Sequence, residues 1–247
     1  MLGAALLLAP IFLQAPVESS SWHLPWNGSI DIGLTSLSGN NESATGTARA
    51  EAKLEQDGYR WLLGAQYSGV RQTDLSTGIA NTTSRLYTAF VEHHQTFDES
   101  DDFYAYGKGS GRSDRPNGLQ GRTDSGIGIG YTVHFFDDNA TLNLEAGPSI
   151  VWENNVGIDP TSTWTSRFAV NLDSKLNTDI RLTTKAEYFR SVGSTEDASA
   201  IGEIGLRWTL KNTWFLQLSS SFAWDNTPAP GFESSDYRQS LTIGTTF

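Results

Sequence analysis

The sequence contains no cysteine and only a single methionine. The absence of cysteine excludes disulfides, thiolate catalysis and cysteine-based zinc sites. Basic residues are scarce as well: 17 Lys and Arg stand against 28 Asp and Glu, which gives a formal net charge of −11. No cluster of Lys or Arg interrupts this acidic balance. We therefore expect no nucleic-acid partner.

Long apolar runs are also missing. The longest, Leu2–Leu13, is shorter than the roughly 20 residues that a helix needs to cross a bilayer, but it has the length of the apolar core of a signal peptide. No Lys or Arg precedes it, and Pro16 follows the expected cleavage after Ala15. A buried core helix is the alternative. We expect residues 1–21 to be a signal peptide and N-terminal lead, followed by one domain over residues 22–247.

The sequence does contain a period-two pattern, which is clearest at the end of the chain. In residues 236–247, Tyr237, Leu241, Ile243 and Phe247 share one face, and mostly polar residues occupy the other. A strand of this kind that ends on an aromatic residue is typical of the closing strand of an outer-membrane β-barrel. We expect Phe247 to be the signal that the barrel-assembly machinery reads during insertion. The alternative is the last strand of a soluble sandwich, and the recurrence of the pattern argues against it.

The same alternation recurs along the chain. In residues 43–56, Arg49, Glu51, Lys53 and Glu55 fall on one face of a strand, whereas a helix would scatter them around its circumference. A hydrophobic content of 38% with 24 Gly suits a barrel, in which only every second strand residue faces lipid. The predicted strands are 26–37, 43–56, 59–71, 83–97, 103–113, 122–136, 141–153, 163–176, 180–192, 200–211, 214–225 and 236–247.

These segments predict an all-β fold, a transmembrane antiparallel up-and-down β-barrel of about twelve strands. Tight turns such as Asp57-Gly58 and Asn212-Thr213 alternate with longer polar loops such as residues 72–82 and 114–121. This asymmetry predicts short periplasmic turns and longer extracellular loops, with both chain ends on the periplasmic side. Pro148 cannot donate to a strand ladder, so we expect a β-bulge there.

Aromatic residues recur at the strand ends and predict two belts on the outer surface, one at each membrane interface. A soluble sandwich gives no reason for aromatic residues at both ends of its outward faces. The predicted girdle consists of Trp26, Tyr59, Phe97, Phe135, Trp152, Trp164, Trp214, Trp224 and Tyr237.

Charged residues of both signs fall on the inward faces. They either pair across strands and fill the interior or line a narrow aqueous path. Isolated buried charges cost several kcal/mol, so most of these residues must be paired or wet. The predicted lumen-lining residues are Arg49, Glu51, Lys53, Glu92, Lys108, Asp124, Arg167, Asp173, Lys175, Arg181, Lys185, Glu187, Glu203 and Arg207.

No arrangement of residues predicts catalysis. Outer-membrane lipid hydrolases use Ser and His near the lipid boundary, but His93 and His94 are adjacent and lie on opposite faces, and no motif of those enzymes surrounds them. We interpret both as polar residues near the periplasmic rim. No metal-ligand spacing is present, and the acidic segment 98–102 is interpreted as a solvated turn rather than a cation site. We expect no catalytic residue, no metal and no cofactor.

Three short motifs stand out: WNGS at 26–29 followed by LTSLSGNNE at 34–42, GIGIGY at 126–131, and the ending at 236–247. Together they resemble the YdiY-like family of salt-induced outer-membrane proteins, although Asn41 stands where Thr is usual in that family. The resemblance covers the whole predicted barrel. It implies an outer-membrane barrel expressed in response to salt, and it supplies no catalytic residues.

The sequence thus predicts a bacterial outer-membrane barrel of the salt-induced or envelope-stress type, acting as a narrow solute channel with a charged lumen. Expected partners are outer-membrane lipids, the barrel-assembly machinery, and small solutes or ions. Two alternatives stay open. One is an outer-membrane lipid hydrolase of the phospholipase or lipid A deacylase type, and the other is a structural or adhesive barrel that acts through its extracellular loops.

Overall fold

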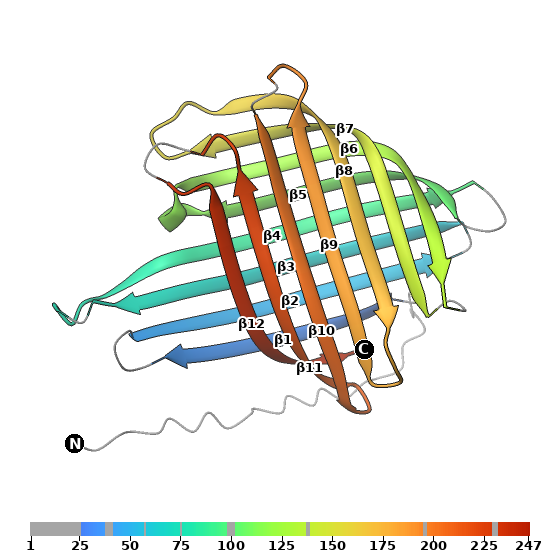
Figure 1. Cartoon of the computed structure of the whole chain (residues 1–247), viewed down its shortest axis with the longest axis horizontal. Helices are drawn as coiled ribbons and strands as arrows, with labels where there is room; N and C mark the ends of the chain where they lie inside the picture. Colours follow the sequence, from blue (N-terminus) through green and yellow to red (C-terminus); the bar gives the residue numbers. More distant parts are fainter. Residues whose placement is uncertain are drawn as a thin grey trace, which may run out of the picture.

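A computed structural model describes residues 26–37, 42–56, 58–74, 76–97, 102–136, 139–194, 197–228 and 232–247. Over these residues the chain forms a closed barrel in which each strand pairs with the strands before and after it (Figure 1). The predicted all-β up-and-down barrel of about twelve strands is thereby confirmed. The predicted signal peptide, residues 1–21, lies outside the described residues. None of the described segments is a helix long and apolar enough to cross a membrane.

All twelve strands are antiparallel to their neighbours. A short 3-10 helix, η1 (Arg115–Asn117), lies between β5 and β6. The strands are β1 Trp26–Leu37, β2 Glu42–Gln56, β3 Tyr59–Thr73, β4 Ala80–Thr96, β5 Phe103–Asp114, β6 Leu119–Phe135, β7 Ala140–Asn155, β8 Thr161–Lys175, β9 Ile180–Ser191, β10 Ala198–Lys211, β11 Trp214–Asp225 and β12 Ser235–Thr246.

The first and last strands close the barrel. β1 pairs with β12 from Ser29↔Thr246 to Ile32↔Ile243, and two backbone hydrogen bonds of 3.0 Å join Gly28 to Phe247. The Phe247 ring lies across Gly28, where a Cβ would sit only 2.4 Å from it. A glycine is therefore needed where the terminal aromatic residue packs over the seam. Closure also removes the unpaired sheet edges that an open sheet would expose.

The alternation of side chains gives the barrel an apolar outer face. On β6, Ile127, Ile129 and Tyr131 are exposed on the outside. The intervening glycines face the interior, where a Cβ on Gly128 would lie 2.7 Å from the Tyr106 ring and one on Gly130 would lie 2.3 Å from the Tyr104 ring. The glycine-rich motif of β6 thus makes room for two tyrosines from β5. An outer face this rich in exposed apolar side chains is typical of a lipid-facing barrel.

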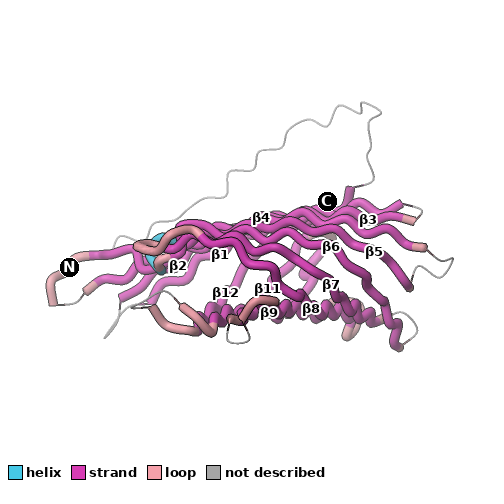
Figure 2. Tube along the Cα trace, turned by 90° about the horizontal axis from the view of Figure 1, so that it is seen from above, coloured by secondary structure: helices cyan, strands magenta, loops and turns pink. Residues whose placement is uncertain are grey.

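The barrel has two walls whose strands cross at a steep angle, as tilted strands of a closed barrel do. Figure 1 shows strands β9–β12, in orange and red, running across the blue and green strands β1–β5. Figure 2, seen from above, shows the same two sets as separate layers. We call the end that holds Trp26 and Phe247 the terminal rim, and the opposite end the loop rim.

Three details differ from the sequence-based expectation. The predicted β-bulge at Pro148 is wrong. The pairs Gly126↔Ser149 and Ile129↔Ala146 have the same register on either side of Pro148, and the pairing of β7 with β8 is continuous. The strand ladder simply omits pairs around the residue that cannot donate. The predicted long loop at 114–121 shrinks to residues 115–118, because η1 makes a tight connection there. Leu54, which alternation places on the outward face, is buried there, with Trp26 and Trp61 directly opposite it on the neighbouring strands.

Candidate functional site: the charged lumen

Ion pairs cross the interior between strands that are not neighbours in the sheet. Arg49 on β2 binds Glu203 on β10 through two contacts, Nη1–Oε1 at 2.6 Å and Nη2–Oε2 at 2.9 Å. Lys185 on β9 lies 3.4 Å from Glu51, also on β2. Because β2 is hydrogen-bonded only to β1 and β3, both contacts span the lumen. The bidentate Arg49–Glu203 pair is the better fixed of the two.

Water reaches part of this region. The side chains of Lys185 and Arg181 are 54% and 47% exposed. Arg181 Nε lies 2.5 Å from Asp173 Oδ1 near the terminal rim. We call Lys185–Glu51 and Arg181–Asp173 the exposed pairs. Such pairs exchange readily with water and contribute about 0–1 kcal/mol each to stability.

A second group of charges is dry. Arg167 on β8, whose side chain is 2% exposed, donates from Nη1 to Glu145 at 2.9 Å and from Nε to Glu187 at 2.7 Å. Glu187 also binds Lys108, which reaches it from β5. The Glu145 side chain is fully buried. Arg167 therefore pairs with both Glu145 and Glu187, and Lys108 supplies the second positive charge that balances these two buried carboxylates.

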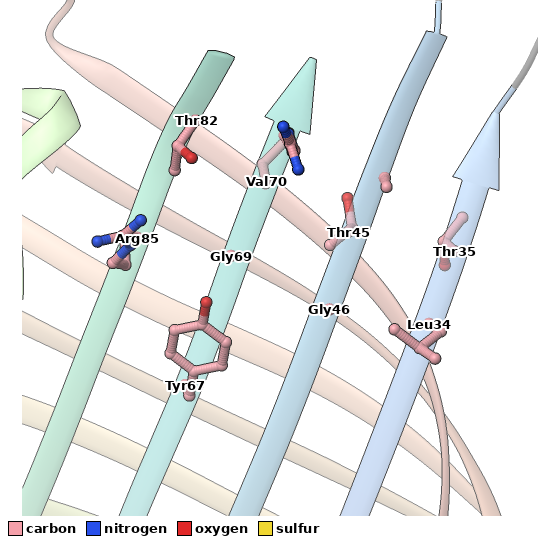
Figure 3. A pocket seen from close by; sticks show the side chains of 11 residues that line it. Leu34, Thr35, Thr45, Gly46, Tyr67, Gly69, Val70, Thr82 and Arg85 are labelled. Carbon is pink, nitrogen blue, oxygen red and sulfur yellow. The ribbon is translucent and has the colours of Figure 1, made fainter. Parts of the chain in front are cut away.

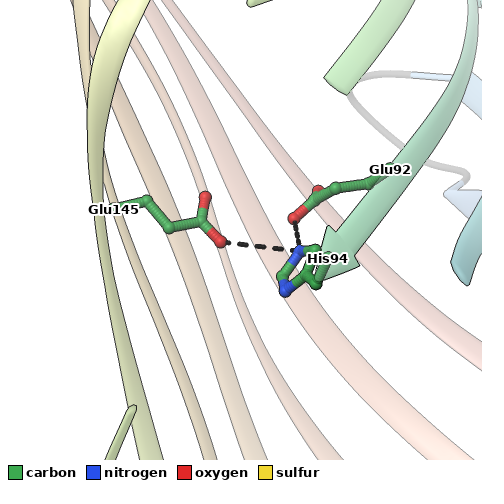
Figure 4. A group of neighbouring side chains, drawn as sticks. All are labelled: Glu92, His94 and Glu145. Carbon is green, nitrogen blue, oxygen red and sulfur yellow. Dashed lines mark hydrogen bonds and ion pairs between the residues drawn. The ribbon is translucent and has the colours of Figure 1, made fainter. Parts of the chain in front are cut away.

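His94 joins this group from β4 (Figure 4). Its Nε2 contacts Glu92 and lies 3.8 Å from Glu145, and its Nδ1 lies 2.5 Å from Arg60. The imidazole stacks on Tyr104, with ring centroids 4.5 Å apart. Tyr104 in turn donates a hydrogen bond of 3.0 Å to Glu145. We call Glu92, His94, Glu145, Arg167, Glu187 and Lys108 the buried cluster.

Three atoms of the buried cluster are close enough to hold one cation. Ligand atoms of Glu92, His94 and Glu145 lie within 4.8 Å of one another. However, Arg60 already occupies the second nitrogen of His94, and Arg167 binds Glu145. A divalent ion would add charge beside two guanidinium groups that already balance these carboxylates. The arrangement is therefore that of an ion-pair network rather than a metal centre.

Cations of the lumen also rest on aromatic rings. Arg207 lies 4.0 Å above the Phe215 ring centroid, and Arg167 lies 5.0 Å above that of Tyr106. Lys185 lies 5.4 Å above the Phe90 ring centroid. Cation–π contacts hold a charge in place while they keep its donors available. The interior thus combines fixed charges with aromatic rings.

A further set of pairs lies toward the loop rim. Arg238 on β12 reaches Asp114 on β5 at 2.7 Å and Ser84 on β4 at 3.1 Å. Arg122 on β6 binds Glu153 at 3.0 Å and Ser199 on β10 at 2.8 Å. A small polar cavity of about 160 Å³ lies among β2, β3, β11 and β12, beside Arg238.

The other residues predicted to line the lumen occupy simpler positions. Asp124 accepts a hydrogen bond from Ser110, and Arg207 donates to Gln217 at 2.9 Å. Lys53 pairs with Glu55 at 2.5 Å where both side chains are exposed. Lys175 is exposed at the end of β8, two residues after Asp173 on the same face. The fold thus brings most of the predicted set into paired contacts, while Lys53 and Lys175 stay at the terminal rim.

Sequence reasoning missed several members of the site. His94 was interpreted as a polar residue near a rim, and this is wrong in that the ring is buried among charges. Glu145, Tyr104 and Arg60 were not singled out as site residues, although their strand parity points inward. This inward parity was the sequence signal that could have identified them. Which inward residues meet depends on the stagger of the strands, which no single-strand pattern contains.

The predicted girdle residues sit at strand ends. Phe97, Trp164, Trp214 and Tyr237 are well exposed on the outer face. Phe135 and Trp152 are exposed to a lesser degree. The girdle members Trp26, Tyr59 and Trp224 are half-buried.

Comparison with known proteins gives a family and a fold. The model of a family described as protein of unknown function, DUF481, matches residues 30–247. No curated protein matches the chain. Among solved structures, the NanC porin is 9% identical with a TM-score of 0.52, and the match covers 90% of this chain and 98% of that one. The translocator domain of the autotransporter NalP from Neisseria meningitidis is 12% identical with a TM-score of 0.46, over 90% and 87% of the two chains. At these identities the likeness shows the fold alone.

Proposed function

The chain belongs to the DUF481 family of proteins of unknown function, and we propose that it is an outer-membrane barrel that passes small solutes or ions through a narrow, charge-lined lumen. The observation that carries this proposal is the pair of lumen-spanning contacts, Arg49–Glu203 and Lys185–Glu51. Both contacts cross the interior, so any path beside them is narrow. The Lys185–Glu51 pair also keeps charge in contact with water, which a sealed interior would not need.

Desolvation energies favour a water path over a merely structural filling. An interior that only had to be filled would be at least as stable with apolar side chains, because the attraction between paired buried charges seldom exceeds the cost of removing them from water. Exposed charges such as Lys185 and Arg181 instead favour hydrated ions that pass them. The basic residues Arg181 and Lys185 are expected to attract anions locally, because distant charge is screened beyond a Debye length of about 8 Å.

Planar-bilayer recording tests the proposal. Wild-type protein should show small, discrete conductance steps. The double variant Arg181→Gln/Lys185→Gln should shift the reversal potential toward cations with folding retained. Lys211→Gln is the matched control, since Lys211 is exposed at the terminal-rim end of β10 and should leave selectivity unchanged. No conductance in wild-type protein would contradict the channel and favour a structural or adhesive barrel.

Membrane orientation and insertion are part of the same proposal. We expect the signal peptide of residues 1–21 to be removed and the terminal rim to face the periplasm. A single cysteine at Thr77 should label from outside intact cells, whereas one at Gly58 should not. Deletion of Phe247, which packs across Gly28 at the seam, should lower the yield of folded barrel as measured by heat-modifiable gel mobility. Equal labelling at both positions would contradict the orientation, and an unchanged yield would contradict the assembly signal.

The lipid-hydrolase alternative is less well supported. His94 lies inside the barrel with both ring nitrogens in contact with other side chains. His93 lies on the outer face against Trp61, with centroids 4.4 Å apart. A base at the lipid boundary needs a nitrogen free to accept a proton. Acyl release from phospholipid or lipopolysaccharide that is lost in His93→Ala would revive the alternative. Salt-induced expression also stays a proposal, which protein levels in high-salt medium would test.

A further inference from the structure

A shallow groove marks the outer face of β1–β4 near the loop rim (Figure 3). It has a volume of about 460 Å³ and is lined by Leu34, Ala44, Gly46, Tyr67, Gly69 and Arg71, among others. These are outward positions, and Leu34 is 79% exposed. The volume suits a small headgroup rather than a whole lipid, since pockets for drug-sized ligands range from about 300 to 1,000 Å³.

One of the two glycines in the groove leaves part of its floor open. A Cβ on Gly46 would meet only the Leu34 side chain, at 3.6 Å. The hydroxyl of Tyr67 lies over Gly69, 2.4 Å from where a Cβ would stand. A side chain at Gly46 would therefore fill space that the fold keeps free, whereas the Tyr67 hydroxyl already occupies the space over Gly69. Glycine within a strand is typical of a place where another group approaches the backbone closely.

Two arginines border the groove, one beside it and one nearer the loop rim. Arg85 on β4 is directly opposite Gly69, and Arg71 on β3 is opposite Ala44 on β2. A register shift at Val70/Arg71 separates their levels. Both side chains are exposed. Among the described residues, neither guanidinium group has a hydrogen bond or ion pair, although Glu42 stands nearby, opposite Thr73.

Below the arginines lies an aromatic pair. The rings of Tyr67 and Tyr87 are 5.1 Å apart, and both are exposed on the outer face. Tyrosine rings in this position typically lie at the level of lipid headgroups. The order from mid-barrel to rim is therefore apolar surface, aromatic rings, and a groove with cations at its edges. A lipid with acyl chains below and a phosphate above has the matching order.

We propose that this groove binds the phosphorylated headgroup of lipopolysaccharide in the outer leaflet. Arg71 and Arg85 hold a phosphate between them, since guanidinium groups bind phosphate with paired charge-assisted hydrogen bonds. The sugar lies over Gly46, against Leu34 and Tyr67. The site rests on the proposed outer-membrane location and orientation. It does not depend on conduction through the lumen.

The test measures binding of lipopolysaccharide to the purified barrel in detergent. Arg71→Gln/Arg85→Gln should weaken the Kd by about 10- to 100-fold, as expected for lost hydrogen bonds between charged groups. Arg190→Gln is the matched control, because Arg190 is a lone exposed residue on the outer face of β9 near the same rim. Gly46→Leu should also weaken binding, because it fills the groove while both arginines stay. Heat-modifiable mobility shows that each variant is folded.

The outcomes separate a lipid-headgroup site from nonspecific surface charge and from a free-phosphate site. Dephosphorylated lipopolysaccharide should bind wild-type protein as weakly as intact lipopolysaccharide binds the double variant. An equal loss in Arg190→Gln would mean nonspecific surface charge, and competition by inorganic phosphate alone at similar concentrations would mean a free-phosphate site. Either result would overturn the proposal, as would unchanged affinity in the double variant. Conductance is measured in a separate experiment, so this binding test can be interpreted even if the channel proposal fails.

Discussion

The exposed pairs and the buried cluster use the same residue types in very different surroundings. Lys185–Glu51 and Arg181–Asp173 stay in contact with water, whereas Arg167 and Glu145 are almost completely enclosed. In the first region each charge has water as a substitute partner. In the second region each charge depends on its protein partners. We infer that one side of the lumen is built for stability and that the other carries the proposed water path.

The largest expected effect lies in the buried cluster. Arg167→Met removes the partner that binds both Glu145 and Glu187, and Glu145 has no other cation within hydrogen-bonding distance among the described residues. Breaking a buried pair by removing one member costs about 3–5 kcal/mol. The denaturant midpoint of the refolded barrel measures this loss. Arg167→Met/Glu145→Gln should recover part of it, and a loss below about 1 kcal/mol would refute the enclosed character of the cluster.

How far the sequence alone predicts these two regions depends on the residue. The strands and their inward faces follow from alternation, as in Arg49, Glu51 and Lys53, because a strand has a side-chain period of two. The contact of His94 with Glu145 could not be predicted, since it joins β4 to β7 across a lumen whose shape depends on closure and stagger. The sequence also did not predict that β6 begins at Leu119 or that the register is kept at Pro148, because both depend on pairing with neighbouring strands.

An intermediate loss of stability is expected when a side chain is added on the packed side of the lumen. Gly128→Val places a Cβ 2.3 Å from the Ala146 carbonyl and 2.7 Å from the Tyr106 ring. Overpacking of this kind costs about 1–3 kcal/mol. Gly107→Val is the matched control on the neighbouring strand, because a Cβ there meets nothing within 4 Å. Thermal unfolding in detergent compares the two. Equal unfolding temperatures would mean that Tyr106 is free to move and that this side of the lumen is loosely packed.

The smallest effect on stability is expected in the exposed pairs. Arg181→Met removes the same charge as Arg167→Met but leaves Asp173 in water, so the free energy of unfolding should fall by no more than about 1 kcal/mol. The same denaturation series measures both variants. A loss comparable with that of Arg167→Met would show that the two regions do not differ in their dependence on partners.

The most direct test asks whether current flows through the lumen and, if so, on which side. The sequence contains no cysteine, so single cysteines give a clean background. Thr183→Cys lies on β9 between Arg181 and Lys185, and Ser149→Cys lies in the packed interior against Thr165. A charged thiol reagent added during planar-bilayer recording should reduce the current through Thr183→Cys and leave Ser149→Cys unchanged. Block at Ser149→Cys alone, or at neither position, would contradict a water path along the exposed pairs.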